Sequence, residues 1–261
     1  MVLKCSNLFF TILIALVALA GCDRAQKMIV DEVPSDTNMD NTMMGMEAIP
    51  VKLVWLINFD DGGHQETYNN WVASIAETLI APEELRRSRI YNNVDPEMRP
   101  HRYVEFEFES YLDAATYMNR PEIAALLQES TNHVTDQTVH TFIQDVDYTY
   151  AKEEEGDWQI KHVYLIDYFL GGRQAYLEWA RDVSTGLISP TQLKAVASYD
   201  NYYGESPHRL VELEFPTQED ADAYHALEEV IQMAEAELER QAGNWSLVMH
   251  KFELSSDYIN E

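Results

Sequence analysis

A charged segment that occurs twice in the chain holds the side chains best suited to acid–base chemistry. It reads PHRYVEFEF at residues 100–108 and PHRLVELEF at residues 207–215. If each segment is a strand, its side chains alternate between two faces, so the polar residues of each copy point the same way. That polar set consists of His101, Tyr103, Glu105 and Glu107 in the first copy and His208, Glu212 and Glu214 in the second.

Two interpretations of this polar face stay open. Carboxylates held close together raise one another's pKa and can serve as acid and base, and with histidines they can hold a divalent metal. In the other interpretation the face is solvated or forms a polar seam, and the motif appears twice only because the chain is duplicated. We take the four glutamates and two histidines as catalytic candidates. We predict no metal site, because the sequence has no HExxH or CxxC motif, and it has no nucleophile elbow for covalent catalysis either.

The charged segment belongs to a duplication that covers most of the chain. Residues 50–148 align with residues 157–254 in unbroken order, with a short charged linker at 149–156 and a tail at 255–261. Small gaps suffice, so chance is an implausible explanation. Matching pairs include Lys52 and Lys161, Trp71 and Trp179, Tyr91 and Tyr199, Asn93 and Asn201, and His140 and His250.

Each copy has the pattern β-α-β-β-α-β. A short apolar run is followed by a helical apolar face, two further strands, and a second helix that opens with a capping pattern (Ser110-x-x-Asp113 and Thr217-x-x-Asp220). This order is the ferredoxin-like split βαβ pattern. A tandem pair of such units with an HRxVExEF third strand resembles the dimeric α/β-barrel superfamily, which includes antibiotic-biosynthesis monooxygenases and EthD-like proteins.

The resemblance implies an α+β fold of two tandem ferredoxin-like repeats, paired within one chain as an intramolecular pseudo-dimer. Their sheets would face each other and enclose a cavity, with the polar face of the third strands inside or at the interface. Residues at the strand ends could line that cavity, although turn formation is the simpler role of several of them. These pocket candidates are Tyr91, Asn93, Tyr103, Tyr199 and Asn201.

The second helix carries one histidine of interest. Some haem-degrading relatives place a haem ligand on this helix, where the second copy has His225 and the first has Met118. Because only one copy has the histidine and no other cofactor motif is present, we predict no cofactor. His140 and His250 of the last strands and the helix tryptophans Trp71 and Trp179 are expected to be structural.

The amino terminus has the layout of a secretory signal. Lys4 precedes an apolar run of 13 residues at 8–20, which is short for a membrane span. Its end, Leu-Ala-Gly-Cys22, resembles the lipobox of bacterial lipoproteins. This resemblance implies removal of residues 1–21 and lipidation of Cys22. Residues 22–49 are polar and aperiodic, and we interpret them as a flexible tether. Asp23 resembles the inner-membrane retention signal of lipoproteins from enteric bacteria, which implies the inner membrane, with the outer membrane as the alternative.

Charge narrows the range of partners. The formal net charge is −27, which repels nucleic acid, so no DNA or RNA partner is expected. The hypothesis favoured by the sequence is a membrane-anchored module facing the periplasm that binds a small molecule or a partner protein of the envelope. The alternatives are a cofactor-independent enzyme of monooxygenase or isomerase type acting between the sheets, and a structural envelope protein.

Overall fold

Each repeat starts with a short apolar strand, β1 (Val51–Asn58) in the first and β6 (Ile160–Tyr168) in the second. In the computed structural model, which describes residues 48–60, 62–152 and 158–260, both strands are hydrogen-bonded on both edges. Strands paired on both sides are enriched in β-branched and aromatic residues, as these two are. The remaining elements of the first repeat are α2 (Gly62–Ile80), β2 (Arg87–Asn93), β3 (Arg102–Phe108), α3 (Tyr111–Met118), α4 (Pro121–Ser130) and β4 (Asp136–Gln144).

The second repeat follows the same order. A short 3-10 helix, η1 (Val146–Tyr148), and the strand β5 (Tyr150–Ala151) lie between the repeats. Its elements after β6 are α5 (Gly172–Ile188), β7 (Ala195–Asn201), β8 (Arg209–Phe215), α6 (Gln218–His225), α7 (Glu228–Gln241) and β9 (Trp245–Ile259).

The two four-stranded sheets join into one closed antiparallel barrel. Within the repeats the strand orders are β4-β1-β3-β2 and β9-β6-β8-β7. β2 pairs with β9 of the other repeat, and β4 pairs with β7, so each repeat's last strand meets the other's second strand. Closure leaves eight strands around a common interior.

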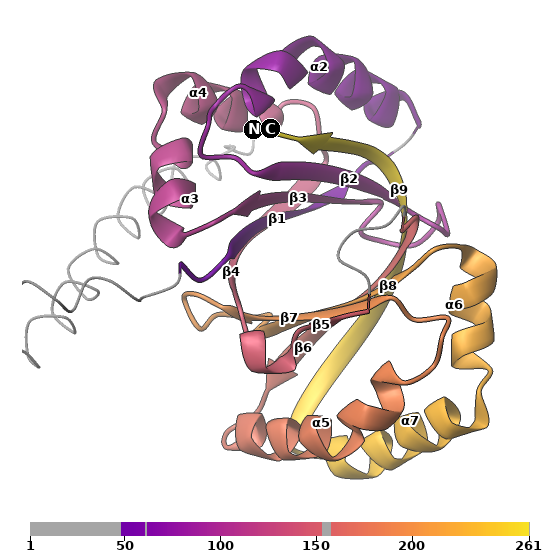
Figure 1. The fold of residues 1–261 in the computed structure, drawn as a ribbon. Helices are drawn as coiled ribbons and strands as arrows, with labels where there is room; N and C mark the ends of the chain where they lie inside the picture. Colours follow the sequence, from indigo (N-terminus) through magenta and orange to yellow (C-terminus); the bar gives the residue numbers. More distant parts are fainter. Residues whose placement is uncertain (1–47, 61, 153–157, 261) are drawn as a thin grey trace, which may run out of the picture. The chain divides into compact units, whose positions relative to one another are not determined.

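The two faces of the sheet have different partners. The outward side chains of the first repeat pack with α2, α3 and α4, in a core that includes Trp55, Phe106 and Tyr117. Those of the second repeat pack with α5, α6 and α7 in two further clusters. In Figure 1 the helices of the two repeats lie on opposite sides of the barrel. The inward side chains form a separate cluster around Tyr91, Tyr103, Phe142 and Phe252.

The predicted fold class is confirmed: an α+β chain of two tandem ferredoxin-like repeats paired as an eight-stranded barrel. The second helix is broken in both copies, since α3 ends at Met118 before Pro121 opens α4, and α6 stops at His225 before α7 begins at Glu228. β9 extends to Ile259, past residue 254, because its last part pairs with β2. Cys22, Asp23 and residues 1–47 of the predicted signal and tether lie outside the described residues. Within the described ranges, no helix is both long and apolar enough to cross a bilayer.

Candidate functional site

The glutamates of the repeated motif lie inside the barrel, bridged by two lysines. Glu105 and Glu212 are 0% and 1% exposed. Lys52 Nζ is 2.8 Å from Glu105 Oε2 and 2.7 Å from Glu212 Oε2. Lys161 Nζ, at the equivalent position of the second repeat, is 2.8 Å from Glu105 Oε1 and 3.2 Å from Glu212 Oε2. Each lysine therefore contacts glutamates of both repeats, and the polar face is a buried seam rather than a solvated surface.

Arg89 and two tyrosines complete this interior network. The Arg89 guanidinium lies 2.5 Å from Glu105 Oε1 and 2.5 Å from Glu107 Oε1. The hydroxyl of Tyr103 donates to Glu212 Oε1 at 2.5 Å, and that of Tyr91 donates to Glu105 Oε1 at 3.3 Å. We call the charged members the ionic lattice: Lys52, Arg89, Glu105, Glu107, Lys161, Glu212 and Glu214.

Position within the lattice sets the pKa of each carboxyl group. Burial would raise the pKa of Glu105, but Arg89, Lys161 and Lys52 hold it well below its ordinary value. The pKa of Glu107 is lowered to about 2, because the attraction of Arg89 and Lys52 exceeds the effect of burial. The pKa of Glu212 is raised, by burial and then by repulsion from Glu105, against the opposing attraction of the lysines. Glu212 is therefore the member of the lattice that most readily takes up a proton.

The candidate histidines do not join the glutamates. His101 accepts a hydrogen bond from the Phe59 backbone N–H at 3.0 Å, and His208 lies 2.9 Å from an Asp167 carboxylate oxygen. Both occupy the start of the third-strand motif, at the end of the barrel opposite Glu107 and Glu214. Among the described residues, no group of three or more His, Cys, Asp or Glu side chains could hold a metal ion.

The asparagine pocket candidates hold turns. Asn93 donates to Pro100 O at 2.9 Å and accepts from the Asp95 N–H, and Asn201 makes the equivalent bonds with Pro207 and Tyr203. Neither asparagine lines the two cavities of about 610 and 540 Å³ in the molecule. Of the tyrosine candidates, Tyr199 borders a cavity, and its ring carries the Lys52 ammonium 4.6 Å from its centroid.

A cavity of about 610 Å³ occupies one end of the barrel and reaches the ionic lattice. We call it the mouth cavity. Its floor includes Lys52, Arg89, Glu212 and Glu214, and Trp158 lies on its wall. The interior expected between the two sheets is thus filled by side chains at its centre and hollow at this end.

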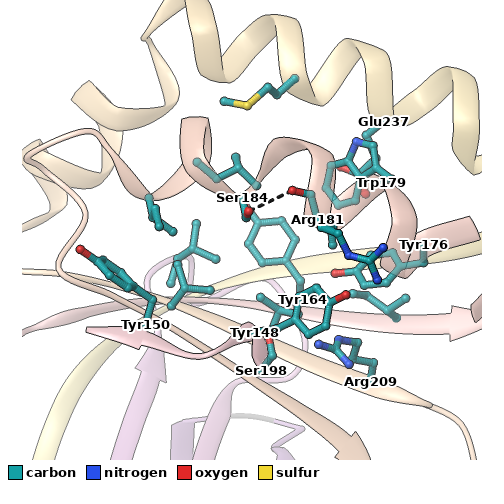
Figure 2. A pocket seen from close by; sticks show the side chains of 18 of the residues that line it. Tyr148, Tyr150, Tyr164, Tyr176, Trp179, Arg181, Ser184, Ser198, Arg209 and Glu237 are labelled. Carbon is teal, nitrogen blue, oxygen red and sulfur yellow. Dashed lines mark hydrogen bonds between the residues drawn. The ribbon is translucent and has the colours of Figure 1, made fainter. Parts of the chain in front are cut away.

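A second cavity, of about 540 Å³, lies outside the barrel in the second repeat, between its sheet and the helices α5 and α7. We call it the outer cavity. Aromatic rings make up much of its wall, and Figure 2 shows those of Tyr148, Tyr164 and Tyr176 between the sheet and the helices. Most of the remaining wall is aliphatic, and the cavity is therefore suited to an apolar ligand.

The first repeat has almost no space at the same place. The corresponding hollow beneath α2 and α4 measures about 50 Å³. Smaller side chains in the second repeat account for much of the difference. Residues lining the two hollows correspond as Val72 to Ala180, Ile90 to Ser198 and Phe106 to Leu213.

Polar side chains also border the outer cavity, among them Arg181, Ser198, Arg209 and Glu237. Burial raises the pKa of Glu237 to about 7, and the only opposing cause is a hydrogen bond of 3.4 Å from Trp245 Nε1. Trp179 is 7% exposed, and its Nε1 has no hydrogen-bond partner within the described part of the chain. Its ring lies 6.2 Å from that of Trp245, so Trp179 and Glu237 are neighbours of the same indole. A protonated carboxyl and an indole N–H are both donors, and they match a ligand oxygen.

His225 borders the outer cavity but is already engaged. Its Nε2 lies 2.8 Å from Nδ1 of His162, a fully buried residue, and the two rings are stacked. In the first repeat the equivalent pair is Leu53 and Met118, which belong to the apolar core. Because the outer nitrogen of His225 faces another histidine, the geometry does not present it as a haem ligand.

Sequence reasoning did not identify the outer cavity or Glu237. A cavity depends on side-chain sizes that meet from several elements, whereas periodicity reports only which face of one element is apolar. The available signal was a comparison between the repeats, where large apolar residues of the first copy become Ala, Ser and Leu in the second.

No protein-family model and no curated protein matches the chain. Solved structures do share its fold. An anthrone oxidase-like protein matches with a TM-score of 0.62 at 10% identity, covering 80% of this chain and 93% of that one. A proposed monooxygenase from Lactobacillus acidophilus NCFM matches with a TM-score of 0.53 at 9% identity, covering 81% and 96%. A chlorite dismutase variant from Candidatus Nitrospira defluvii matches with a TM-score of 0.52 at 10% identity, covering 79% and 92%. The chain is therefore a distant structural match to the dimeric α/β barrels, and at this identity the likeness extends to the fold alone.

Proposed function

We propose that this protein is a lipid-anchored binding module of the cell envelope, which holds an apolar, ring-bearing small molecule in the outer cavity. The observation that carries the proposal is the tenfold difference in volume between the equivalent hollows of the two repeats, about 540 Å³ against about 50 Å³. The fold itself does not require the larger space, because the first repeat closes it with ordinary core residues.

Apolar side chains that line an open space lack close-packed neighbours on one side, which costs stability. A ligand that fills the space offsets this loss. Aromatic walls favour a planar apolar ligand, and the donors at Trp179 and Glu237 favour one that carries an acceptor oxygen.

A fluorescence titration with 1-anilinonaphthalene-8-sulfonate tests this proposal. We expect saturable binding at one site in the native chain. The triple variant Ala180→Val, Ser198→Ile, Leu213→Phe restores the residues of the first repeat and should abolish binding while raising the melting temperature. Val248→Ile, at a residue 56% exposed on β9, is the matched control and should bind as the native chain does. Equal binding by the triple variant would refute the assignment of the site.

A second candidate is catalysis in the same cavity by an enzyme that needs no cofactor. The observation that favours it is Glu237, whose carboxyl has a pKa of about 7 and can both accept and donate a proton near neutral pH. The probe is β-tetralone, an aromatic ketone with acidic C–H bonds, incubated in D₂O and followed by NMR. Enhanced exchange of the C–H hydrogens that disappears in Glu237→Gln supports an enzyme. Exchange at the rate of buffer alone would refute catalysis of this exchange and favour the binding module.

The proposed membrane anchor rests on Cys22 in the lipobox-like sequence. Two or more acyl chains on that residue would hold the protein at a bilayer. Radiolabelled palmitate should enter the native chain in cells and not the Cys22→Ser variant. Retention of the label in Cys22→Ser would contradict the anchor without bearing on the outer cavity.

A further inference from the structure

Arg89 of β2 and Ala197 of β7 occupy equivalent positions in the two repeats. Arg89 faces Glu105 across the β2–β3 ladder, and Ala197 faces Glu212 in the same register of the β7–β8 ladder. The guanidinium of Arg89 reaches the carboxylates of its own repeat and comes within 3.4 Å of Glu214. In the second repeat the side chain of Ala197 ends at Cβ and cannot take that place.

The adjacent inward position differs in the same way. Arg87 faces Glu107 on the neighbouring strand, and its counterpart Ala195 faces Glu214. Arg87 is held by Asp257 through two hydrogen bonds of 2.9 and 2.6 Å. The second repeat therefore has two alanines where the first has two arginines.

The carboxylates show the consequence. Glu107 lies 2.5 Å from the Arg89 guanidinium, whereas its counterpart Glu214 has no cationic nitrogen nearer than 3.2 Å in the described chain. Glu214 is nevertheless 6% exposed, so little water replaces the missing partner. Glu214 keeps two cationic partners, Lys161 at 3.2 Å and Arg89 at 3.4 Å, but both are more distant than the closest partner of Glu107, and a further cation placed beside it would be stabilised.

The cations of the ionic lattice are distributed unevenly among its carboxyl groups. Among the described residues, the ionic lattice has four carboxylates and three cations, which leaves one negative charge over. The side chain of Arg86 lies at the rim, where it is 53% exposed. It is 3.7 Å from Glu107, a carboxylate that the Arg89 guanidinium already contacts. With Arg86 the charges balance, and among the described residues Glu214 is the carboxyl group of the lattice whose nearest cationic nitrogen is farthest, at 3.2 Å.

The mouth cavity lies where the second arginine would be. Ala195, Ala197, Glu212 and Glu214 all border it, together with Lys52 and Tyr199. Its volume of about 610 Å³ exceeds what one guanidinium needs, so an occupant can carry further atoms toward the barrel end.

We propose that the mouth cavity binds a guanidinium or amidinium group, which occupies the place of the missing arginine between Glu212 and Glu214. The internal precedent is Arg89, whose planar guanidinium already contacts the equivalent carboxylates. A planar fork of N–H donors fits two carboxylates in a way that a single ammonium does not. The group can come from a free small molecule or from an arginine side chain of a peptide. The site lies inside the barrel and the outer cavity lies outside it, although Thr149, Tyr150 and Val196 line both. The inference does not depend on the function proposed for the outer cavity.

Isothermal titration of the folded chain with three probes tests the proposal: ethylguanidinium, butylammonium and the peptide Gly-Arg-Gly. We expect ethylguanidinium to bind at one site and about tenfold more tightly than butylammonium, a difference of ~1.4 kcal/mol. Stronger binding of Gly-Arg-Gly than of ethylguanidinium assigns the site to peptides, and the reverse assigns it to free small molecules.

Two variants locate the binding. Ala197→Arg should fill the site from within, raise the melting temperature and weaken ethylguanidinium binding at least tenfold. Ala236→Arg adds the same charge at an exposed position of α7 and should leave binding unchanged. Glu214→Gln should also weaken binding about tenfold, and it decides the matter if Ala197→Arg does not fold. No ethylguanidinium binding by the native chain, or equal binding by the native chain and Glu214→Gln, would overturn the proposal.

Discussion

Lys52 of the first repeat donates a hydrogen bond of 2.7 Å to Glu212 of the second, deep inside the barrel. The equivalent lysine, Lys161, donates to Glu105 at 2.8 Å in the opposite direction. These crossed contacts hold the two sheets together by charge as well as by the backbone pairing of β2 with β9. The pseudo-dimer is therefore specified from within, by residues that repeat with the duplication.

Lys52→Met should strongly destabilise the protein. Removing one partner of a buried ion pair leaves a carboxylate uncompensated, and we expect the free energy of unfolding to fall by about 3–5 kcal/mol. Urea denaturation followed by circular dichroism measures the change. As a control, Arg240→Ala breaks an ion pair whose side chains are 52% and 61% exposed, and should change the value by less than about 1 kcal/mol. Similar small losses for both variants would show that the lattice is not a structural requirement.

The stacked pair of His162 and His225 should make the second repeat sensitive to acid. Burial, followed by the proximity of His225 and Lys251, lowers the pKa of His162 to about 3, with Asp222 opposing. Burial and Lys251 also lower the pKa of His225, again against Asp222. The unfolded chain takes up a proton below the ordinary histidine pKa while the folded chain does not, so stability falls as the pH drops from about 6.5 toward 3.

Installing the first repeat's residues, His162→Leu with His225→Met, should remove this sensitivity. Between pH 6.5 and pH 5 the native chain should lose about 2 kcal/mol that the double variant keeps. The reciprocal change, Leu53→His with Met118→His, should confer acid sensitivity on the first repeat. Parallel stability curves for the native chain and the first double variant across this range would contradict the account.

Glu237 should produce the opposite dependence on pH. Its pKa in the folded chain is about 7, above the ordinary value of 4.5, so the folded state holds a proton that the unfolded state releases. Stability should fall as the pH rises from about 4.5 to 7, by about 1–3 kcal/mol for this partly exposed group. Glu237→Gln has no carboxyl group at this position, so its free energy of unfolding should not fall for this reason. Relative to the native chain, its stability should increase as the pH rises from 4.5 to 7. Chemical denaturation at pH 4.5 and pH 8 measures it, and a constant difference between the two proteins would count against the buried carboxyl.

The fold followed from the sequence because duplication supplied two independent versions of one pattern. Alternation in the third strand also placed Glu105 and Glu212 on the interior face. The lattice partners were harder to see. Lys52 and Lys161 open apolar runs at matching positions, and inspection of one strand does not show that each meets the glutamates of the other repeat.

The cavities could not be predicted from the sequence pattern for a different reason. Ser198 and Ala180 are unremarkable in their own elements, and they leave a space only because both border the gap between the sheet and α5. Likewise, Ala197 indicates a site only when it is compared with Arg89, which has the same register position in the other repeat. Both sites follow from differences between equivalent positions of the two repeats, which periodicity within one repeat does not show.

Anomalous diffraction from crystals soaked in 4-bromophenol would test the central claim most directly. The probe is an aromatic ring with an acceptor oxygen, and bromine marks its position. The account predicts a bromine peak in the outer cavity, between α5, α7 and the sheet of the second repeat, with the phenol oxygen toward Trp179 and Glu237. A bromine peak in the mouth cavity alone, or equal occupancy of the outer cavity in the Ala180→Val, Ser198→Ile, Leu213→Phe variant, would contradict it.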